Sequence, residues 1–250
     1  MTDNLNILIF DIETAPSLGY VWGKYDQTVL KFDKEWIMMS FSAKWLSEKK
    51  ITTLALPDFP GYKKDKEDDK HLVKKLWELF DKADIIIAHN GDNFDIKKAN
   101  ARFLAHKLGA PSPYKTVDTL KIAKKYFSFT SNRLNDLGEK LNLGVKAETG
   151  GFKLWLDCMA GNASAWRKMK IYNKQDVVLL EKVYLALRPW MSSHPRVSKS
   201  ADGICPVCGS SKVQKRGFNY TRYYKYQRYA CNDCGAWSQG KLEKEVRTIS

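Results

Sequence analysis

The order of its apolar segments is the feature that most constrains the fold of this chain. Three early stretches have the length and composition of β-strands, and they occupy 5–10, 36–45 and 51–57. A helical pattern follows, then a short buried strand, then further helical patterns; these occupy 68–83, 84–90, 95–109, 131–144 and 162–188. Consecutive strands followed by strands that alternate with helices predict an α/β fold, with a mixed sheet flanked by helices.

Cysteines indicate a second, smaller unit at the end of the chain. Four of the five lie in two C-x-x-C pairs, CPVCG and CNDCG, which are separated by 22 residues. This spacing is close to that of four-cysteine zinc ribbons, although slightly longer than usual. We therefore predict that Cys205, Cys208, Cys231 and Cys234 hold one structural Zn²⁺. Disulfide bonds between these cysteines are the alternative. The remaining cysteine, Cys158, is expected to be a small buried thiol.

Prolines, a glycine and several serines indicate a boundary between the two units. Pro189, Pro195 and Gly203, with several serines, follow the last long helical pattern and precede the first cysteine pair. We predict an α/β domain over 1–189, a linker over 190–203 and a zinc ribbon over 204–250. So small a module has too little apolar core to fold without its metal.

Charge points to a polyanionic partner. The chain carries 42 Lys and Arg against 28 Asp and Glu, a net charge of +14. Nucleic acid is the polyanion that most often explains such a surplus, although solubility alone is the alternative. The sequence contains no run of about 18 apolar residues and no basic segment before an apolar one at its start. We therefore expect a cytoplasmic protein that does not span a membrane.

Carboxylates gather at the ends of two predicted strands. Asp11 and Glu13 close the first strand in FDIET, and residues two apart on a strand face the same way. Two solvated acids at a strand exit are the alternative. Asp95 follows the buried strand in HNGDNFD, where capping of the next helix is the alternative and Phe94 would anchor the turn in the core. Asp92 lies in the same segment and could be mistaken for the site residue.

The last long helical pattern contributes a third element, YNKQD. Tyr172 and Asp176 are four residues apart, so they share one face of the helix. For Tyr172, a half-buried core position is the alternative. A cluster of acids without His or Cys suits Mg²⁺ or Mn²⁺ better than Zn²⁺.

Together, these elements resemble the motifs of the DEDD 3′→5′ exonucleases of DnaQ-like, RNase H-like fold. That family has D-x-E on a central strand, then N-x2-3-[F/Y]-D, then a Tyr four residues, or a His five, before a final Asp. Here Ile171 stands five residues before Asp176, so the sequence is similar to the tyrosine branch, which includes the proofreading domains of family-B DNA polymerases. The resemblance covers about residues 5–188. Its matching positions are Asp11, Glu13, Asn90, Phe94, Asp95, Tyr172 and Asp176.

The resemblance implies a catalytic mechanism that uses two metal ions, Mg²⁺ or Mn²⁺. Asp11 would bridge both ions, Glu13 and Asp176 would complete the tighter site, and Asp95 would hold the second ion largely through water. Tyr172 would orient the attacking water. The product would be a 5′-nucleoside monophosphate released from a 3′ end.

Further residues are assigned to substrate binding. Thr14, Asn90 and Phe94 lie in or beside the motifs. The segment from Thr14 to Trp36 is rich in aromatics, and Trp22 or Tyr25 could stack on the terminal base, with core packing as the alternative.

In the C-terminal unit, a predicted hairpin arm interleaves cations with tyrosines. Tyr224 and Arg228 fall on one side of it and could bind single-stranded nucleic acid; tyrosines packed around a small zinc core are the alternative.

The predicted function is therefore a 3′→5′ exonuclease that acts on single-stranded or frayed 3′ ends of DNA. A separate polymerase or another replication protein would be its partner if it proofreads or processes DNA in trans. Two alternatives stay open: an exoribonuclease with the same chemistry, and a nucleic-acid-binding scaffold protein with a disused nuclease domain. The presence of all four acids and the Tyr argues against the scaffold.

Overall fold

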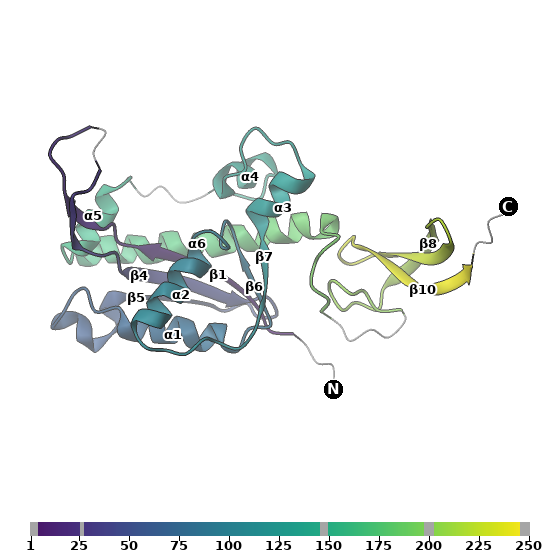
Figure 1. Ribbon diagram of the computed structural model, residues 1–250, viewed down its shortest axis with the longest axis horizontal. Coiled ribbons are helices and arrows are strands. Elements are labelled where there is room, and N and C mark those ends of the chain that lie inside the picture. Colours follow the sequence, from purple (N-terminus) through teal and green to yellow (C-terminus); the bar gives the residue numbers. More distant parts are fainter. Residues whose placement is uncertain (1–4, 26–27, 146–149, 198–202, 246–250) are drawn as a thin grey trace.

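The computed structural model describes residues 5–25, 28–145, 150–197 and 203–245. Its larger part is an α/β body, and a small three-stranded module follows at the C-terminal end (Figure 1). None of the helices in the described ranges is long and apolar enough to cross a membrane.

A five-stranded sheet forms the centre of the α/β body, with strand order β5-β4-β1-β6-β7. Strands β1, β4 and β5 pair antiparallel, whereas β6 and β7 run parallel to β1. The predicted mixed sheet is confirmed. The strands are β1 (Ile7–Thr14), β4 (Met38–Trp45), β5 (Ile51–Ala55), β6 (Ile85–Ala88) and β7 (Lys115–Asp118).

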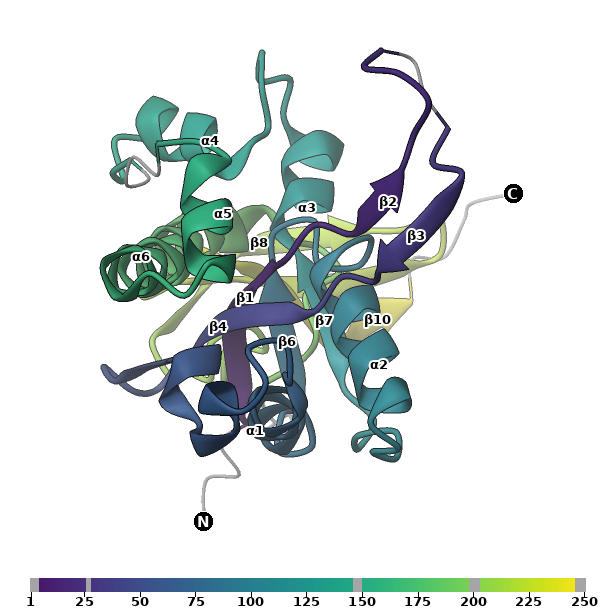
Figure 2. The ribbon, with the colours of Figure 1, turned by 90° about the vertical axis from the view of Figure 1, so that its left-hand side faces the viewer.

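Helices cover both faces of this sheet (Figures 1 and 2). Alternate residues of β1 enter two apolar cores, because side chains of a strand point to opposite faces. Leu8 and Phe10 join the core under α1 and α2, and Ile7 and Ile9 join the core under the second half of α6. The helices are α1 (Lys70–Phe80), α2 (Asp95–Ala105), α3 (Thr119–Tyr126), α4 (Leu134–Lys140), α5 (Lys153–Met159) and α6 (Ala163–Leu187).

The longest helix, α6, carries functional candidates to the sheet. It begins at Asn162, whose side chain accepts hydrogen bonds from the Ser164 and Ala165 amides. It packs on β1, β4 and β5, and an ion pair between Lys44 and Glu181 joins it to β4. This packing holds the middle of α6 over the end of β1.

The aromatic segment after β1 is a two-stranded hairpin, where the sequence indicated no regular element. Its strands are β2 (Leu18–Tyr20) and β3 (Lys31–Lys34), and they extend beyond the body at the upper right of Figure 2. All side chains of both strands are exposed. Apolar periodicity could not reveal this hairpin, because it buries no face.

The C-terminal module contains β8 (Val213–Tyr220), β9 (Tyr224–Cys231) and β10 (Trp237–Glu245), in the order β10-β9-β8. Its buried apolar cluster has five members, of which three are cysteines: Cys205, Val207, Cys231, Cys234 and Ala236. A short helical turn, η3 (Arg188–Trp190), and the following segment connect it to α6. Met191 of this segment is buried in the core of the body, and the Val197 amide donates to the Pro206 carbonyl at 2.7 Å.

Candidate active site

Three carboxylates converge where β1 ends beneath α6. Asp11 and Glu13 lie two residues apart on β1, and Asp176 lies on α6. One oxygen of each lies within 4.8 Å of the others, and Asp176 is only 1% exposed. Acids this close repel one another unless a cation neutralises them. The cluster therefore has the donor atoms and the spacing of a site for a hard divalent cation.

Asn173 fixes the orientation of Asp11. Its Nδ2 donates to the Asp11 carboxylate at 2.6 Å and to the Asp11 carbonyl at 3.3 Å. The Ser40 hydroxyl in turn donates to Asn173 Oδ1 at 3.3 Å. Asn173 is fully buried and was missed in the sequence analysis. The available signal was its position three residues before Asp176, which places it on the same helical face.

Asp95 approaches the same end of β1 from α2. It is 5% exposed, and its Oδ1 accepts the amide of Ile12, the residue between Asp11 and Glu13, at 3.3 Å. Asp95 is the first residue of α2 and not its N-cap, which is Phe94. The capping alternative is therefore wrong. The expectation that Phe94 is anchored in the core is also wrong, because its side chain is 40% exposed.

Asp118, which was not among the predicted site residues, holds the loop that leads to Asp95. Its carboxylate accepts the Asn90 amide at 2.9 Å and the Asp92 amide at 3.3 Å, while it also caps α3. Asn90 has a φ of 64°, a left-handed conformation that Asn tolerates better than most residues. Asp92 pairs with Lys121 at 2.6 Å.

Tyr172 lies on α6, one turn before Asp176. It is half-buried, and its ring meets Trp155 of α5 edge-on at 6.1 Å between centroids. The half-buried position considered as the alternative is thus observed. Tyr172 shares a helical face with Asp176, because the two residues are four apart.

The aromatic residues after β1 do not pack in the core. Trp22 is 87% exposed and Tyr25 is 73% exposed. Thr14, the last residue of β1, is half-buried next to a shift in the pairing of β1 with β4. The core-packing alternative is therefore wrong for Trp22 and Tyr25, whose rings are exposed to solvent.

The four cysteines of the C-terminal module form a compact cluster. All four sulfurs lie within 4.8 Å of one another, with Cys205 and Cys234 at 3.6 Å and Cys208 and Cys231 at 3.7 Å. Tetrahedral zinc with Zn–S bonds of about 2.3 Å would separate its sulfurs by roughly 3.8 Å. All four are free cysteines, so the disulfide alternative is wrong and the cluster is consistent with a zinc ribbon.

Backbone turns shape this cluster for a metal. The amides of Gly209 and Gly235 donate to the carbonyls of Cys205 and Cys231 at 2.9 and 3.0 Å. Both glycines have positive φ, 76° and 71°, which favours glycine. Burial raises the pKa of the Cys208 thiol to about 11.

Tyr224 and Arg228 share one face of β9. Tyr224 is 37% exposed, and the exposed Arg228 places its guanidinium carbon 4.9 Å from the ring centroid of Trp237. Neither residue is buried around the cysteine cluster.

Comparison with known proteins identifies the α/β body. The family model of the RNase H superfamily matches residues 8–188. The chain belongs to the RNase H superfamily. A stretch of 82 residues is 37% identical to DNA polymerase III PolC-type of Ureaplasma parvum, and it covers 33% of this chain and 6% of that protein.

The structure is also similar to the family B DNA polymerase of the hyperthermophilic archaeon Pyrobaculum calidifontis. The TM-score is 0.55 at 15% identity, over 74% of this chain and 25% of that one. At this identity the similarity concerns the fold alone. The chain thus corresponds to a small part of each polymerase. RNase H-like folds generally use divalent metals, and this superfamily membership together with the acidic cluster supports a nuclease.

Proposed function

We propose that this chain is a metal-dependent 3′→5′ exonuclease that hydrolyses DNA to 5′-nucleoside monophosphates. The observation that carries the proposal is the convergence of the Asp11, Glu13 and Asp176 carboxylates at the end of β1. Asp95 contacts the backbone between the first two. The proximity of these acids in a chain of the RNase H superfamily supports the proposal.

In this proposal the acids would hold two Mg²⁺ or Mn²⁺ ions. Asp11 would contact both ions, Glu13 and Asp176 would complete one site, and Asp95 would hold the other largely through water. When bound, such ions lower the pKa of a water and neutralise charge on the phosphate and the leaving oxygen. Asn173 supports this role, because its hydrogen bonds leave one Asp11 orientation favoured.

The remaining residues would position the substrate and the attacking water. The hydroxyl of Tyr172 would align the water, since Trp155 holds the ring in place. The exposed rings of Trp22 and Phe94 would contact terminal bases, and Thr14 and Asn90 would contact the strand near the acids. Beside Asn90 lies a cavity of about 600 Å³ whose lining includes Lys124 and Arg133, which suits a phosphate backbone.

The C-terminal module would bind one structural Zn²⁺ and add affinity for nucleic acid. In this proposal, 1–189 is the exonuclease domain, 190–203 is the linker and 204–250 is the zinc ribbon. Residues 213–231 contain five Lys and Arg, no Asp or Glu, and six aromatics. Tyr224 and Arg228 on β9 would contribute to this surface. A separate polymerase or replication protein would be a partner if the enzyme proofreads in trans.

A digestion assay tests the proposal. Single- and double-stranded DNA and RNA of matched sequence, labelled at the 3′ or the 5′ end, are incubated with Mg²⁺ or Mn²⁺. We expect stepwise shortening of 5′-labelled DNA and release of labelled mononucleotide from 3′-labelled DNA. Asp11→Asn is the matched control, because it keeps the shape of the side chain and removes its charge.

Each other outcome assigns a different function. Faster degradation of RNA than of DNA would make the chain an exoribonuclease. If the chain bound nucleic acid but hydrolysed none with Mg²⁺ or with Mn²⁺, it would be a scaffold protein. Internal cleavage products would contradict the exonuclease assignment itself.

A further inference from the structure

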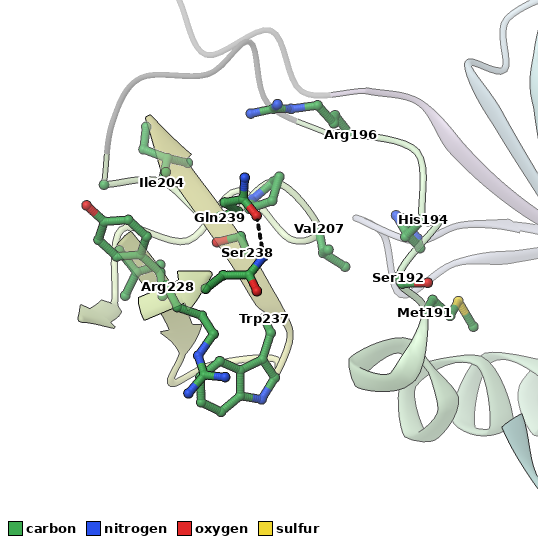
Figure 3. Close-up of a pocket in the computed structure, with 16 residues that line it drawn as sticks. Met191, Ser192, His194, Arg196, Ile204, Val207, Arg228, Trp237, Ser238 and Gln239 are labelled. Atoms are coloured by element: carbon green, nitrogen blue, oxygen red, sulfur yellow. Dashed lines mark hydrogen bonds between the residues drawn. The ribbon is translucent and has the colours of Figure 1, made fainter. Parts of the chain in front are cut away.

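A cavity of about 730 Å³ lies between the C-terminal module and the segment that follows α6 (Figure 3). The module contributes residues from all three of its strands, and the segment contributes Met191, His194 and Arg196. The proposed function uses Arg228 of this lining but assigns no ligand to the cavity itself.

Trp237 supplies an aromatic surface in the cavity. It stands in β10 and yet is 54% exposed. The strand register pairs Trp237 with Ala230 and Gln239 with Arg228, so Arg228 is the diagonal neighbour of the indole. Figure 3 shows the guanidinium against the ring, with 4.9 Å between its carbon and the centroid. The arginine orients the indole and places positive charge beside it.

A pair of side-chain amides lies on the same face of the sheet. Asn219 of β8 donates through Nδ2 to Oε1 of Gln239 of β10, at 2.7 Å. After this bond, Asn219 keeps a carbonyl acceptor and Gln239 keeps its amino donors. A neighbouring donor and acceptor of this kind match the edge of a nucleobase.

The charged side chains that line the cavity favour an anionic ligand. Among the described residues that line it, none carries a carboxylate, although the chain contains 28 Asp and Glu. Arg196 and Arg228 are the lining cations. Arg228 uses Nε to donate to the Arg216 carbonyl at 3.1 Å, which leaves the terminal amino groups as donors for a phosphate.

We propose that this cavity binds an unpaired nucleotide of the nucleic-acid strand, with its base stacked on Trp237 and its phosphate at Arg228. Met191 and His194 also line a second cavity, of about 240 Å³, which reaches Asp92 in the loop before Asp95. Because the two cavities share Met191 and His194, a strand held at Trp237 would lie beside the segment that joins the module to the α/β body. The inference rests on the proposed action on nucleic acid but does not require hydrolysis.

The test uses the full chain with Asp11→Asn, so that hydrolysis cannot alter the probe. Anisotropy of a labelled thymidine oligonucleotide of about 20 nucleotides gives the dissociation constant. Because stacking of one base on an aromatic ring corresponds to roughly five- to a hundred-fold in affinity, we expect Trp237→Ala to weaken binding about tenfold. Trp237→Phe should retain most of the affinity.

Two controls separate this site from general effects. Trp190→Ala removes an indole of η3 that is 58% exposed and does not line the cavity, so it should change affinity less than twofold. Metal analysis must still find one zinc in Trp237→Ala, which shows that the module is folded. Irradiation of an oligonucleotide that carries 5-iodouracil should cross-link it to Trp237.

Unchanged affinity in zinc-loaded Trp237→Ala, or cross-links confined to the α/β body, would overturn the inference. Hydrolysis is scored separately in the chain that retains Asp11. A chain that binds through Trp237 but degrades nothing would contradict the proposed exonuclease and leave this binding site standing.

Discussion

The α/β body and the C-terminal module are held together by different means. The body has two large apolar cores on the two faces of its sheet, and its acids lie at the edge of these cores. The module has five buried apolar residues, and three of them are also metal-ligand candidates. Removal of the acids should therefore abolish hydrolysis but leave the body folded. Removal of the cysteines should unfold the module.

The first test of this contrast is Asp11→Asn. We expect hydrolysis to fall by at least about a hundredfold, because the neutral amide cannot replace a carboxylate that binds cations. The melting temperature without added Mg²⁺ or Mn²⁺ should be equal to or above that of the wild type, since one repulsive charge is gone. Calorimetry and the end-label assay measure the two quantities. If the variant kept a tenth of the wild-type activity, the assignment of Asp11 to the active site would be wrong.

The second test is Cys208→Ser, together with Cys231→Ser. We expect the loss of one equivalent of zinc and fast amide hydrogen exchange throughout β8, β9 and β10. The body should still melt cooperatively and should still hydrolyse a short oligonucleotide. Cys158→Ser is the matched control, because this buried cysteine lies in α5, far along the chain from the cluster, and should leave the zinc content unchanged. If loss of the zinc also abolished the cooperative melting of the body, the two regions would fold as one unit.

The third test, Tyr172→Phe, concerns the body alone. The lost hydroxyl would align the water only as the reaction proceeds, so we expect kcat to fall about ten- to a hundred-fold with little change in KM. The ring keeps its contact with Trp155, so the melting temperature should hold. A rise in KM at constant kcat would instead make Tyr172 a residue that contacts substrate.

The sequence predicts those parts of the molecule whose pattern is local. Four strands of the sheet, the helices α1, α2, α4 and α6, and the cysteine cluster follow from apolar period and ligand spacing, and the structure confirms the mixed sheet. The short elements β7, α3 and α5 were not predicted. Asn173 shares a helical face with Asp176, but the roles of Asn173 and Asp118 could not be identified in this way. Each acts through a hydrogen bond to a residue distant in the chain, Asp11 and Asn90 respectively, and no local pattern encodes that pairing.

Exposed elements were also difficult to predict. The β2–β3 hairpin presents no buried face, and Phe94 is exposed although its position after a strand suggested core anchoring. Hydrophobicity is a guide to burial, and it fails where an aromatic residue is kept at the surface. Such exposed rings cluster in regions to which we assign contacts with nucleic acid, namely the hairpin and the C-terminal module.

The smallest expected effect concerns His194, which lies where the two regions meet. Its Nδ1 is 2.7 Å from the Pro195 carbonyl, so this nitrogen carries the proton, and Nε2 accepts from the Tyr184 hydroxyl at 2.8 Å. Burial lowers the pKa of His194 from its usual 6.5, with Arg188 adding to the shift, and burial raises the pKa of Tyr184 to about 12. Both groups are therefore neutral near pH 7.

Because the folded pKa of His194 is lowered, its contribution to stability is complete above the unfolded pKa near 6.5. It is lost as the pH falls below that value toward the folded pKa. We expect His194→Gln to flatten the decline of the melting temperature between about pH 7 and pH 5 by a few degrees. NMR titration of the imidazole ring gives the folded pKa directly. A value at or above 6.5 would show that the segment after α6 leaves this ring open to water, and the two regions would then be joined more loosely than their contacts indicate.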